Sequence, residues 1–368
     1  MKVSLVTRTA GLAAVAAIGL TACGSSSSGG TGSTPSAGGS GGGGGASSTS
    51  LSPQGSTFQA TLEEQWATKF HTANPSDQIT YSPTGSTAGI AAFTQGTAPF
   101  AGSDVTMSSD EQSAADNACG SPALTIPITS GGVAIMYDLP GVSKPLNLSA
   151  ATIAGIFMGK ITSWNDAAIK ADNPGVSLPN TPVSVYYRAD GSGTTNVLSG
   201  FLDAAAHSVW TLGVNKQFTN WPTGSGATGS SGVAQGVKST PGGITYAEIT
   251  YAKQDGLQTA NVKGFNNSYL PLTNASVAQS IASGFAVTGT GQDLAGSLSF
   301  DKMTGYPIST VSYVLVCSTY KNAGVGALVK SYLTYAAGDG QSEGPALGFA
   351  PLPKGLDRKV MASVASIS

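Results

Sequence analysis

Apolar and polar residues alternate with two different periods along the chain from about residue 52 onward. Leu62, Trp66 and Phe70 recur at a spacing of four, which predicts a helix within 56–73. Strands that alternate with helices predict an α/β fold, and no repeat of fixed period suggests a solenoid or a propeller. Further helices are expected within 86–98, 149–174 (two helices joined by a turn), 193–210, 247–256 and 326–340, the last of which is expected to close the chain. Strands are expected within 78–83, 99–107, 125–140 (two runs), 182–188, 242–247 and 311–320.

Three of the predicted loops place glycine and hydroxyl residues at the start of a helix. They are 55–58 (GSTF), 84–89 (TGSTAG) and 188–195 (RADGSGTT). In α/β folds ligands bind beyond the carboxyl ends of strands, where such loops enter helices. A helix N-terminus presents unpaired N–H groups and a partial positive charge, so it favours anions. One such loop taken alone is most often an N-cap, but three of them, one carrying Arg188, favour a site for an oxyanion.

The loop at 188–195 differs from the familiar nucleotide-binding loops. Its GSGTTN run lacks the lysine of GxxxxGK[ST], and Asn196 stands where the third glycine of GxGxxG would fall. No GxSxG elbow with a plausible histidine partner occurs, which leaves Ser192 a weak candidate nucleophile.

Charged residues are scarce, at 10% of the chain, and the formal net charge is −2. This balance disfavours nucleic acid as a partner, since nucleic-acid binding needs a basic surface. The arginines are Arg8, Arg188 and Arg358, and the two histidines, His71 and His207, have no partners at metal-ligand spacing. Metal ions, other cofactors and histidine-based catalysis are therefore not expected.

Residues 1–23 have the features of a bacterial lipoprotein signal peptide. A basic start precedes an apolar run, 9–20, that is short for a membrane span. The LTAC sequence that ends at Cys23 resembles a lipobox, in which this cysteine is lipidated; an ordinary signal peptide with an incidental cysteine is the alternative. Residues 24–51 are rich in Gly and Ser and predict a flexible tether. The chain is therefore expected outside the cytoplasm, anchored to the cell membrane by lipid.

Cys119 and Cys317 would then lie in an oxidising compartment. A disulfide between them and two buried free thiols are both compatible with the sequence, because their separation in space cannot be read from it.

Five segments resemble, in the same order, the phosphate-binding lipoproteins and periplasmic phosphate-binding proteins of ABC importers. They are 55–58, 84–111, 156–169, 188–202 and 242–257, and the similarity extends from about residue 52 to about residue 335. The resemblance implies the two-lobed type II periplasmic binding-protein fold, with a ligand cleft between the lobes. One lobe would contain residues 52–132 and 306–368, and the other residues 133–305.

The resemblance also implies roles for the residues that match the motifs. Asp190 would pair with Arg188 and hold it. The implied phosphate contacts are Thr57, Phe58, Ser86, Asp104, Arg188, Ser192, Gly193 and Thr194. The chain departs from the family pattern in the GSTAG loop, in the order of the small residues before Asp104, and after about residue 335.

The chemistry of Asp104 fits phosphate independently of the resemblance. Monohydrogen phosphate carries an O–H donor, whereas sulfate has no proton at neutral pH. A buried carboxylate that accepts this proton would leave sulfate facing an unpaired negative group and so reject it. Arg188 and the backbone amides would bind the acceptor oxygens. The alternatives are that Asp104 is a loop cap or a structural carboxylate and that Asp190 forms an Asp-Gly turn.

The implied function is that of a monomeric receptor that closes on inorganic phosphate and delivers it to a membrane permease and its ATPase, with no bond made or broken. A phosphate-ester hydrolase with Ser192 or Thr194 as nucleophile is one alternative. A receptor for another tetrahedral oxyanion and a surface adhesion protein are the others.

Overall fold

The structure is a computed structural model and describes residues 49–368. The predicted signal peptide, Cys23 and nearly all of the predicted tether lie outside the described residues. Within the described range, no helix combines the length and apolar character that crossing a membrane requires.

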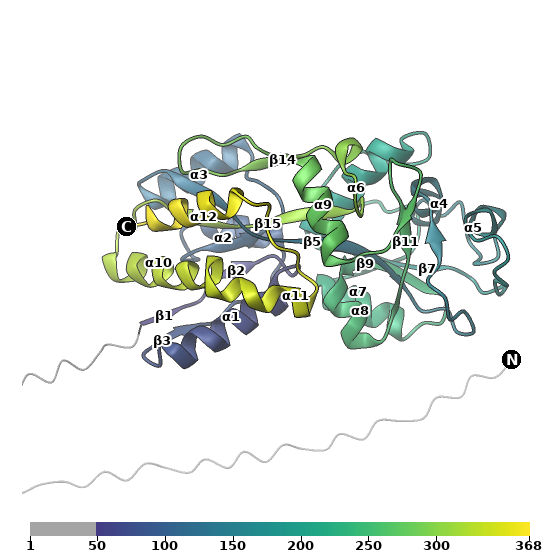
Figure 1. Ribbon diagram of the computed structural model, residues 1–368, viewed down its shortest axis with the longest axis horizontal. Coiled ribbons are helices and arrows are strands. Elements are labelled where there is room, and N and C mark those ends of the chain that lie inside the picture. Colours follow the sequence, from purple (N-terminus) through teal and green to yellow (C-terminus); the bar gives the residue numbers. More distant parts are fainter. Residues whose placement is uncertain (1–48) are drawn as a thin grey trace, which may run out of the picture. The chain divides into compact units, whose positions relative to one another are not determined.

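The elements of the chain follow one another in an α/β order (Figure 1). The strands are β1 (Thr49–Leu51), β2 (Gln54–Gly55), β3 (Asp77–Ile79), β4 (Ala101–Ser103), β5 (Ala123–Tyr137), β6 (Asn147–Leu148), β7 (Ser184–Arg188), β8 (Ser225–Ala227), β9 (Gly243–Glu248), β10 (Gln258–Thr259), β11 (Asn261–Lys263), β12 (Tyr269–Leu270), β13 (Phe285–Val287), β14 (Gly296–Leu298) and β15 (Ser309–Cys317). The helices are α1 (Ala60–Ala73), α2 (Ser86–Thr94), α3 (Ser109–Cys119), α4 (Ala150–Phe157), α5 (Ala167–Asp172), α6 (Gly193–Ala206), α7 (Gly229–Lys238), α8 (Ile249–Asp255), α9 (Asn274–Gly284), α10 (Ala323–Ala337), α11 (Gly344–Leu347) and α12 (Leu356–Ala365), with short 3-10 turns η1 (Phe300–Lys302) and η2 (Asp339–Glu343).

Strand β5 is shared by two groups of strands and joins two lobes. Its residues 123–132 pair with β15, and β4 and β2 follow in the first lobe. Its residues 133–137 pair with β9, and β7 and β8 follow in the second lobe. In Figure 1 the first lobe carries α1, α2, α3, α10 and α12, and the second carries α4 to α8, with β5 running from one to the other. The change of partner falls between Gly132 and Val133.

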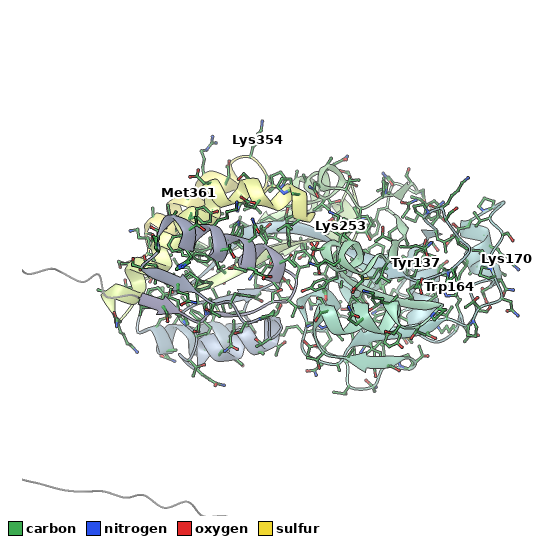
Figure 2. The ribbon with its side chains drawn as sticks, turned by 90° about the horizontal axis from the view of Figure 1, so that it is seen from below. Tyr137, Trp164, Lys170, Lys253, Lys354 and Met361 are labelled. Atoms are coloured by element: carbon green, nitrogen blue, oxygen red, sulfur yellow. A yellow bond between two sulfur atoms is a disulfide. The ribbon has the colours of Figure 1, made fainter. Side chains whose placement is uncertain are left out.

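Aromatic side chains fill the core of each lobe. In the first lobe Phe70 packs edge-on against Tyr332, with ring centres 5.4 Å apart. In the second lobe Tyr137 and Trp164 lie with ring centres 5.2 Å apart, and Figure 2 shows both inside this lobe. These buried contacts hold each lobe as a rigid support for its loops.

Three expectations about elements need correction. Leu51 is buried and Thr49–Leu51 pair with β3, so the tether predicted for 24–51 ends before residue 49. The two runs predicted in 125–140 form one strand, β5, because Gly131 and Gly132 do not make a turn there. They instead allow close packing: a Cβ on Gly131 would lie 2.7 Å from the ring of Phe58. The helix α10 does not close the chain, since α12 follows and packs on it.

Two segments make contacts that the predicted division of the lobes does not include. The β13–β14 hairpin belongs to 133–305, yet the Leu294 amide donates to the Thr125 carbonyl on the first-lobe part of β5. The segment around α11 also bridges the lobes. Its Leu347 carbonyl accepts from the Thr250 hydroxyl, while Ala350 forms a β-bridge with Ser130.

The two cysteines of the described chain form a disulfide. Cys119 at the end of α3 bonds to Cys317 at the end of β15, with a Cα–Cα distance of 5.5 Å. Of the two states that the sequence leaves open, the structure therefore has the bridged one.

Candidate functional site

Four helices begin at the place where the two lobes meet. α1 and α2 belong to the first lobe, and α6 and α7 to the second. The three loops singled out in the sequence lead into α1, α2 and α6, and the loop before α7 adds a fourth with the same Gly/Ser composition. The partial positive ends of these helices are directed at one region, which suits an anion.

Arg188, at the end of β7, is 1% exposed and provides the buried positive charge of this region. Its Nε donates to Asp190 Oδ1 at 2.7 Å, and its Nη2 contacts Asp190 Oδ2. Burial alone would raise the pKa of Asp190, but the hydrogen bonds and charge of Arg188, with the Gly229 amide, hold it below its ordinary value. The Asp190–Arg188 pair expected from the sequence is therefore present, and it fixes the direction of the guanidinium.

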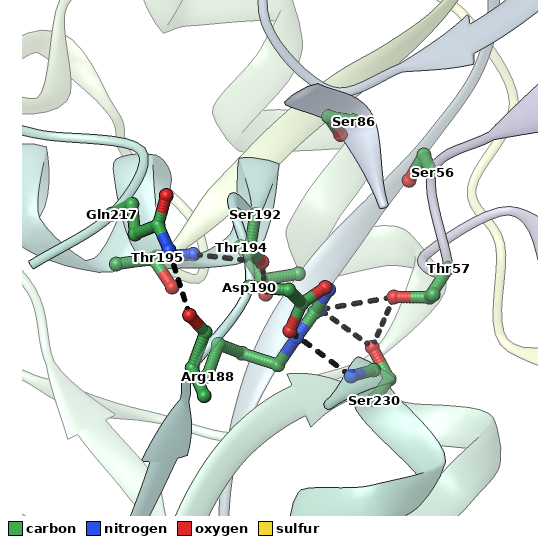
Figure 3. Close-up of polar contacts among 12 residues, drawn as sticks. Ser56, Thr57, Ser86, Arg188, Asp190, Ser192, Thr194, Thr195, Gln217 and Ser230 are labelled. Carbon is green, nitrogen blue, oxygen red and sulfur yellow. Dashed lines mark hydrogen bonds and ion pairs between the residues drawn. The ribbon is translucent and has the colours of Figure 1, made fainter. Parts of the chain in front are cut away.

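Thr57 brings the first lobe into contact with this arginine (Figure 3). Arg188 Nη1 donates to the Thr57 hydroxyl at 2.9 Å and lies 3.3 Å from the Ser230 hydroxyl. The hydroxyls of Thr57 and Ser230 are 2.8 Å apart, and the Thr57 carbonyl accepts from the hydroxyl of Tyr251. A residue before α1 and residues of β7, α7 and α8 thus form one network across the lobes.

Asp104, which follows β4, is the buried acceptor of the site. Its Oδ1 accepts from the Ser312 hydroxyl at 2.6 Å and from the Ser56 hydroxyl at 2.7 Å. Its Oδ2 accepts from Ser56 at 2.6 Å and from the Ser86 hydroxyl at 3.2 Å. Burial raises the pKa of Asp104, and these three hydroxyls together with the charge of Arg188 oppose that rise.

Two glycines of the second lobe let the lobes approach closely. A Cβ on Gly193 would lie 2.4 Å from the Asp104 Cβ, and one on Gly191 would lie 2.3 Å from the Thr87 hydroxyl oxygen. The Thr87 amide donates to the Gly191 carbonyl, and the Thr87 hydroxyl is buried with no hydrogen-bond partner in the described part of the chain. Backbone from one lobe therefore lies directly against side chains of the other.

The remaining predicted residues lie in the same region. The hydroxyls of Ser192 and Thr194 are 2.7 Å apart at the start of α6, where the Thr195 amide contacts Ser192 Oγ at 3.4 Å. The Phe58 amide donates to the hydroxyl of Ser56 at 3.0 Å. Ser56 thus connects the first loop to Asp104.

The structure brings all the candidate residues of the globular part to one site, and it adds residues that sequence reasoning missed. Ser56 lies inside the GSTF loop, where the resemblance assigns ligand roles only to its neighbours Thr57 and Phe58. Ser230 could have been found, because 228–231 (TGSS) repeats the Gly/hydroxyl pattern at a helix start. Ser312 lies within a β-strand, where nothing in the local sequence marks it. Cys23, the predicted lipidation site, lies outside the described residues.

The site offers hydroxyls, amides and a guanidinium as donors and one buried carboxylate as acceptor. The described residues hold no group of three or more His, Cys, Asp or Glu side chains that could bind a metal ion. Such a donor set is suited to a small anion that also carries a proton.

Comparison with known proteins identifies the family. A family model described as "PBP superfamily domain" matches residues 34–339. The chain is 37% identical, over 373 residues and the full length of both chains, to "Phosphate-binding protein PstS 3" of Mycobacterium tuberculosis (strain ATCC 25618 / H37Rv). The chain belongs to the PstS family of phosphate-binding proteins.

A further PstS relative and a solved structure support the same family and fold. "Phosphate-binding protein PstS2" of Mycobacterium bovis (strain BCG / Pasteur 1173P2) is 38% identical over 325 residues, 86% of this chain and 87% of the relative. The "Phosphate-Binding Protein from Stenotrophomonas maltophilia" superposes with a TM-score of 0.68 at 25% identity, covering 85% of this chain and 93% of that structure. The two-lobed α/β fold and the family expected from the sequence are confirmed.

Proposed function

We propose that this PstS-family chain binds inorganic phosphate outside the cytoplasm and delivers it to the permease and ATPase of an ABC importer. The observation that carries the proposal is the arrangement of Arg188 and Asp104, two buried charged groups from different lobes among four helix N-termini. The relatives and the Stenotrophomonas structure that it resembles are themselves named phosphate-binding proteins. As proposed ligand groups we retain Thr57, Phe58, Ser86, Asp104, Arg188, Ser192, Gly193 and Thr194, with Asp190 in support.

The local charge favours an anion that carries a proton. Arg188 is neutralised by Asp190, so an ionised Asp104 leaves the site with excess negative charge. A second anion is tolerated there only if N–H and O–H donors surround it and if it gives a proton to the carboxylate. Monohydrogen phosphate meets both conditions, whereas sulfate at neutral pH meets only the first. Discrimination between the two would then rest on Asp104.

Closure of the two lobes would bury the anion. We propose lobes of residues 52–132 with 306–368 and of residues 133–305, which move about the crossing at β5 and the connection before β15. Such hinge motions need only a few residues to change conformation. Cross-lobe contacts such as Arg188 to Thr57 would form on closure.

We further propose that the protein is a receptor and makes or breaks no bond. The hydroxyls of Ser192 and Thr194 contact each other, while His71 at the end of α1 and His207 next to Asp203 are exposed. A serine or threonine nucleophile needs an adjacent base, and these histidines are not placed to serve as one. Steady turnover of a chromogenic phosphate ester would contradict this part of the proposal.

For the N-terminal segment we propose a lipid anchor at Cys23 and a tether that allows a monomeric receptor to reach its permease. Mass spectrometry of the mature N-terminus would test the anchor, with an unmodified Cys23 as the contradicting result.

Calorimetric titration with phosphate tests the binding function directly. The wild type is expected to bind phosphate at a ratio of one per chain. Arg188→Ala leaves Asp190 and Asp104 uncompensated, so binding is expected to fall by at least about a hundredfold. Unaltered binding by a folded Arg188→Ala variant would place the anion elsewhere.

A further inference from the structure

The Asp104 carboxylate is held by three hydroxyls from three different parts of the chain. Ser56 precedes α1, Ser86 begins α2 and Ser312 lies within β15, 208 positions away. An ionised carboxylate has about four lone-pair positions and can only accept hydrogen bonds. Three hydroxyl donors therefore leave Asp104 room for about one more donor.

The shortest of these contacts have the length of bonds to an ionised carboxylate. The Ser312 hydroxyl lies 2.6 Å from Oδ1, and the Ser56 hydroxyl lies 2.6 Å from Oδ2. O–H bonds to a charged oxygen are typically about 2.5–2.7 Å long. The Ser56 oxygen also accepts a hydrogen bond from the Phe58 amide. This contact leaves the Ser56 hydroxyl proton free to point towards Asp104.

Ser312 and the second lobe contact different oxygens of the Asp104 carboxylate. A Cβ on Gly193, at the start of α6, would come within 2.5 Å of Asp104 Oδ2, so Oδ2 faces the second lobe. Ser312 contacts Oδ1 from the strand inside the first lobe. The Ser312 side chain is fully buried and can hold Oδ1 while Oδ2 faces the second lobe.

The backbone around Ser312 is locally irregular. The register of β15 on β5 shifts between Ser312 and Tyr313, and Ile128 on β5 is left out of the pairing. The carbonyl of this extra residue accepts from the Gln341 side chain instead. Such bulges often turn a side chain towards a functional site.

We propose that Ser312, with Ser56, is a specificity-determining residue of the phosphate site, because it keeps Asp104 an obligate acceptor that only a proton-bearing anion can satisfy. The inference rests on the proposed function. Without the Ser312 donor, Asp104 takes up a proton more readily. It can then donate to a fully ionised anion such as sulfate.

Other charged or titratable groups near Asp104 also affect how readily it takes up a proton. Arg188 of β7 faces it with a positive charge and favours the ionised form. Tyr81, Tyr251 and Tyr313 also face it, and each has a pKa raised mainly by burial, so they stay neutral near pH 7. Loss of the Ser312 bond therefore moves the protonation of Asp104 towards neutral pH.

The test compares phosphate and sulfate affinities of the wild type and Ser312→Ala at about pH 6 and about pH 8.5. The ratio of phosphate affinity to sulfate affinity in Ser312→Ala is expected to fall about tenfold below that of the wild type at the lower pH. It is expected to recover towards the wild-type ratio at the higher pH. Ser309→Ala is the matched control, because Ser309 is buried on the same strand but donates to the Tyr306 carbonyl.

A hydroxyl-retaining variant, Ser312→Thr, is expected to keep the wild-type ratio. If Ser312→Ala does not fold, Ser312→Cys, with a weaker donor of similar volume, is used in its place with the same expectation. A folded Ser312→Ala or Ser312→Cys variant that keeps the wild-type ratio of phosphate to sulfate affinity at both pH values would overturn this inference and leave the proposed function intact. A wild type that binds no phosphate would overturn the proposed function, and the inference with it.

Discussion

Gly193 of the second lobe lies against Asp104 of the first so closely that a Cβ on Gly193 would be 2.4 Å from the Asp104 Cβ. Real Cβ atoms essentially never come within 3.0 Å of another heavy atom in this way. Gly193→Ala would therefore hold the lobes apart or displace Asp104, at a cost typical of overpacking. Because the clash opposes closure of the lobes, phosphate affinity is expected to fall about 10- to 100-fold by calorimetry.

Gly344→Ala is the control for this glycine. Gly344 has helical angles (φ −56°, ψ −49°), and its Cβ would meet Phe349 at an ordinary 3.4 Å. Wild-type affinity is expected for this variant. Full affinity in Gly193→Ala would show that the two lobes do not need to meet here.

Lys216 and Glu111 form an ion pair that joins the lobes. Lys216 Nζ lies 2.9 Å from Glu111 Oε1, while Glu111 Oε2 accepts the Ser108 amide and caps α3. Both side chains are about one third exposed, so the pair is worth about 0.2–1 kcal/mol. Lys216→Met is expected to release phosphate up to about fivefold faster in stopped-flow measurements, with a weaker dependence on salt.

Lys238→Met provides the comparison, because Lys238 pairs with Asp255 inside the second lobe. It should leave the release rate unchanged. If Lys216→Met and Lys238→Met change the phosphate release rate equally, the Lys216–Glu111 pair has no special role in closure of the lobes.

The Cys119–Cys317 disulfide closes a long loop, with a sequence separation of 198. Restricting such a loop in the unfolded chain is expected to stabilise the fold by about 3–5 kcal/mol. Reduction, or the double change Cys119→Ala and Cys317→Ala, should lower the free energy of unfolding in urea by that amount. The double variant should not respond to reductant, and a reductant effect in it would point to another cause.

Two buried glutamates predict how stability changes with pH. Burial raises the pKa of Glu63 to about 7 and that of Glu248 to about 8, from an ordinary value of 4.5. Each group contributes stability that is fully present below about pH 4.5 and is lost as pH rises through its folded pKa, because the folded state holds the proton longer. For Glu63 the loss is up to about 3 kcal/mol.

Glu63→Gln keeps the shape and removes the ionisation. Its melting temperature is expected to fall less than that of the wild type between about pH 5 and about pH 8. The amide oxygen of the introduced glutamine can still accept the Tyr332 hydroxyl that contacts Glu63, so the variant differs from the wild type mainly in ionisation. If the melting temperatures of the wild type and Glu63→Gln change with pH in parallel, the raised pKa assigned to Glu63 is contradicted.

The parts of the site that could be predicted are those marked by local sequence. Gly and Ser at a helix start leave a pattern that can be read without the fold, which is why the Ser86 and Arg188 loops were found. Ser312 is different, since its role comes from pairing between β15 and its neighbours over a long sequence distance. The prediction of two runs in 125–140 was wrong for a related reason. Glycine is required at 131 and 132 by close packing against Phe58 and Leu272, which are distant in sequence, and not by a turn.

The central claim is that the cleft selects a tetrahedral anion that gives a proton to Asp104. Calorimetric titration of the wild type and Asp104→Asn with phosphate and with sulfate tests it most directly. The wild type is expected to prefer phosphate by at least about a hundredfold, and Asp104→Asn to reduce this preference to within about tenfold. Equal wild-type affinities for the two anions, or an undiminished preference in Asp104→Asn, would contradict the claim.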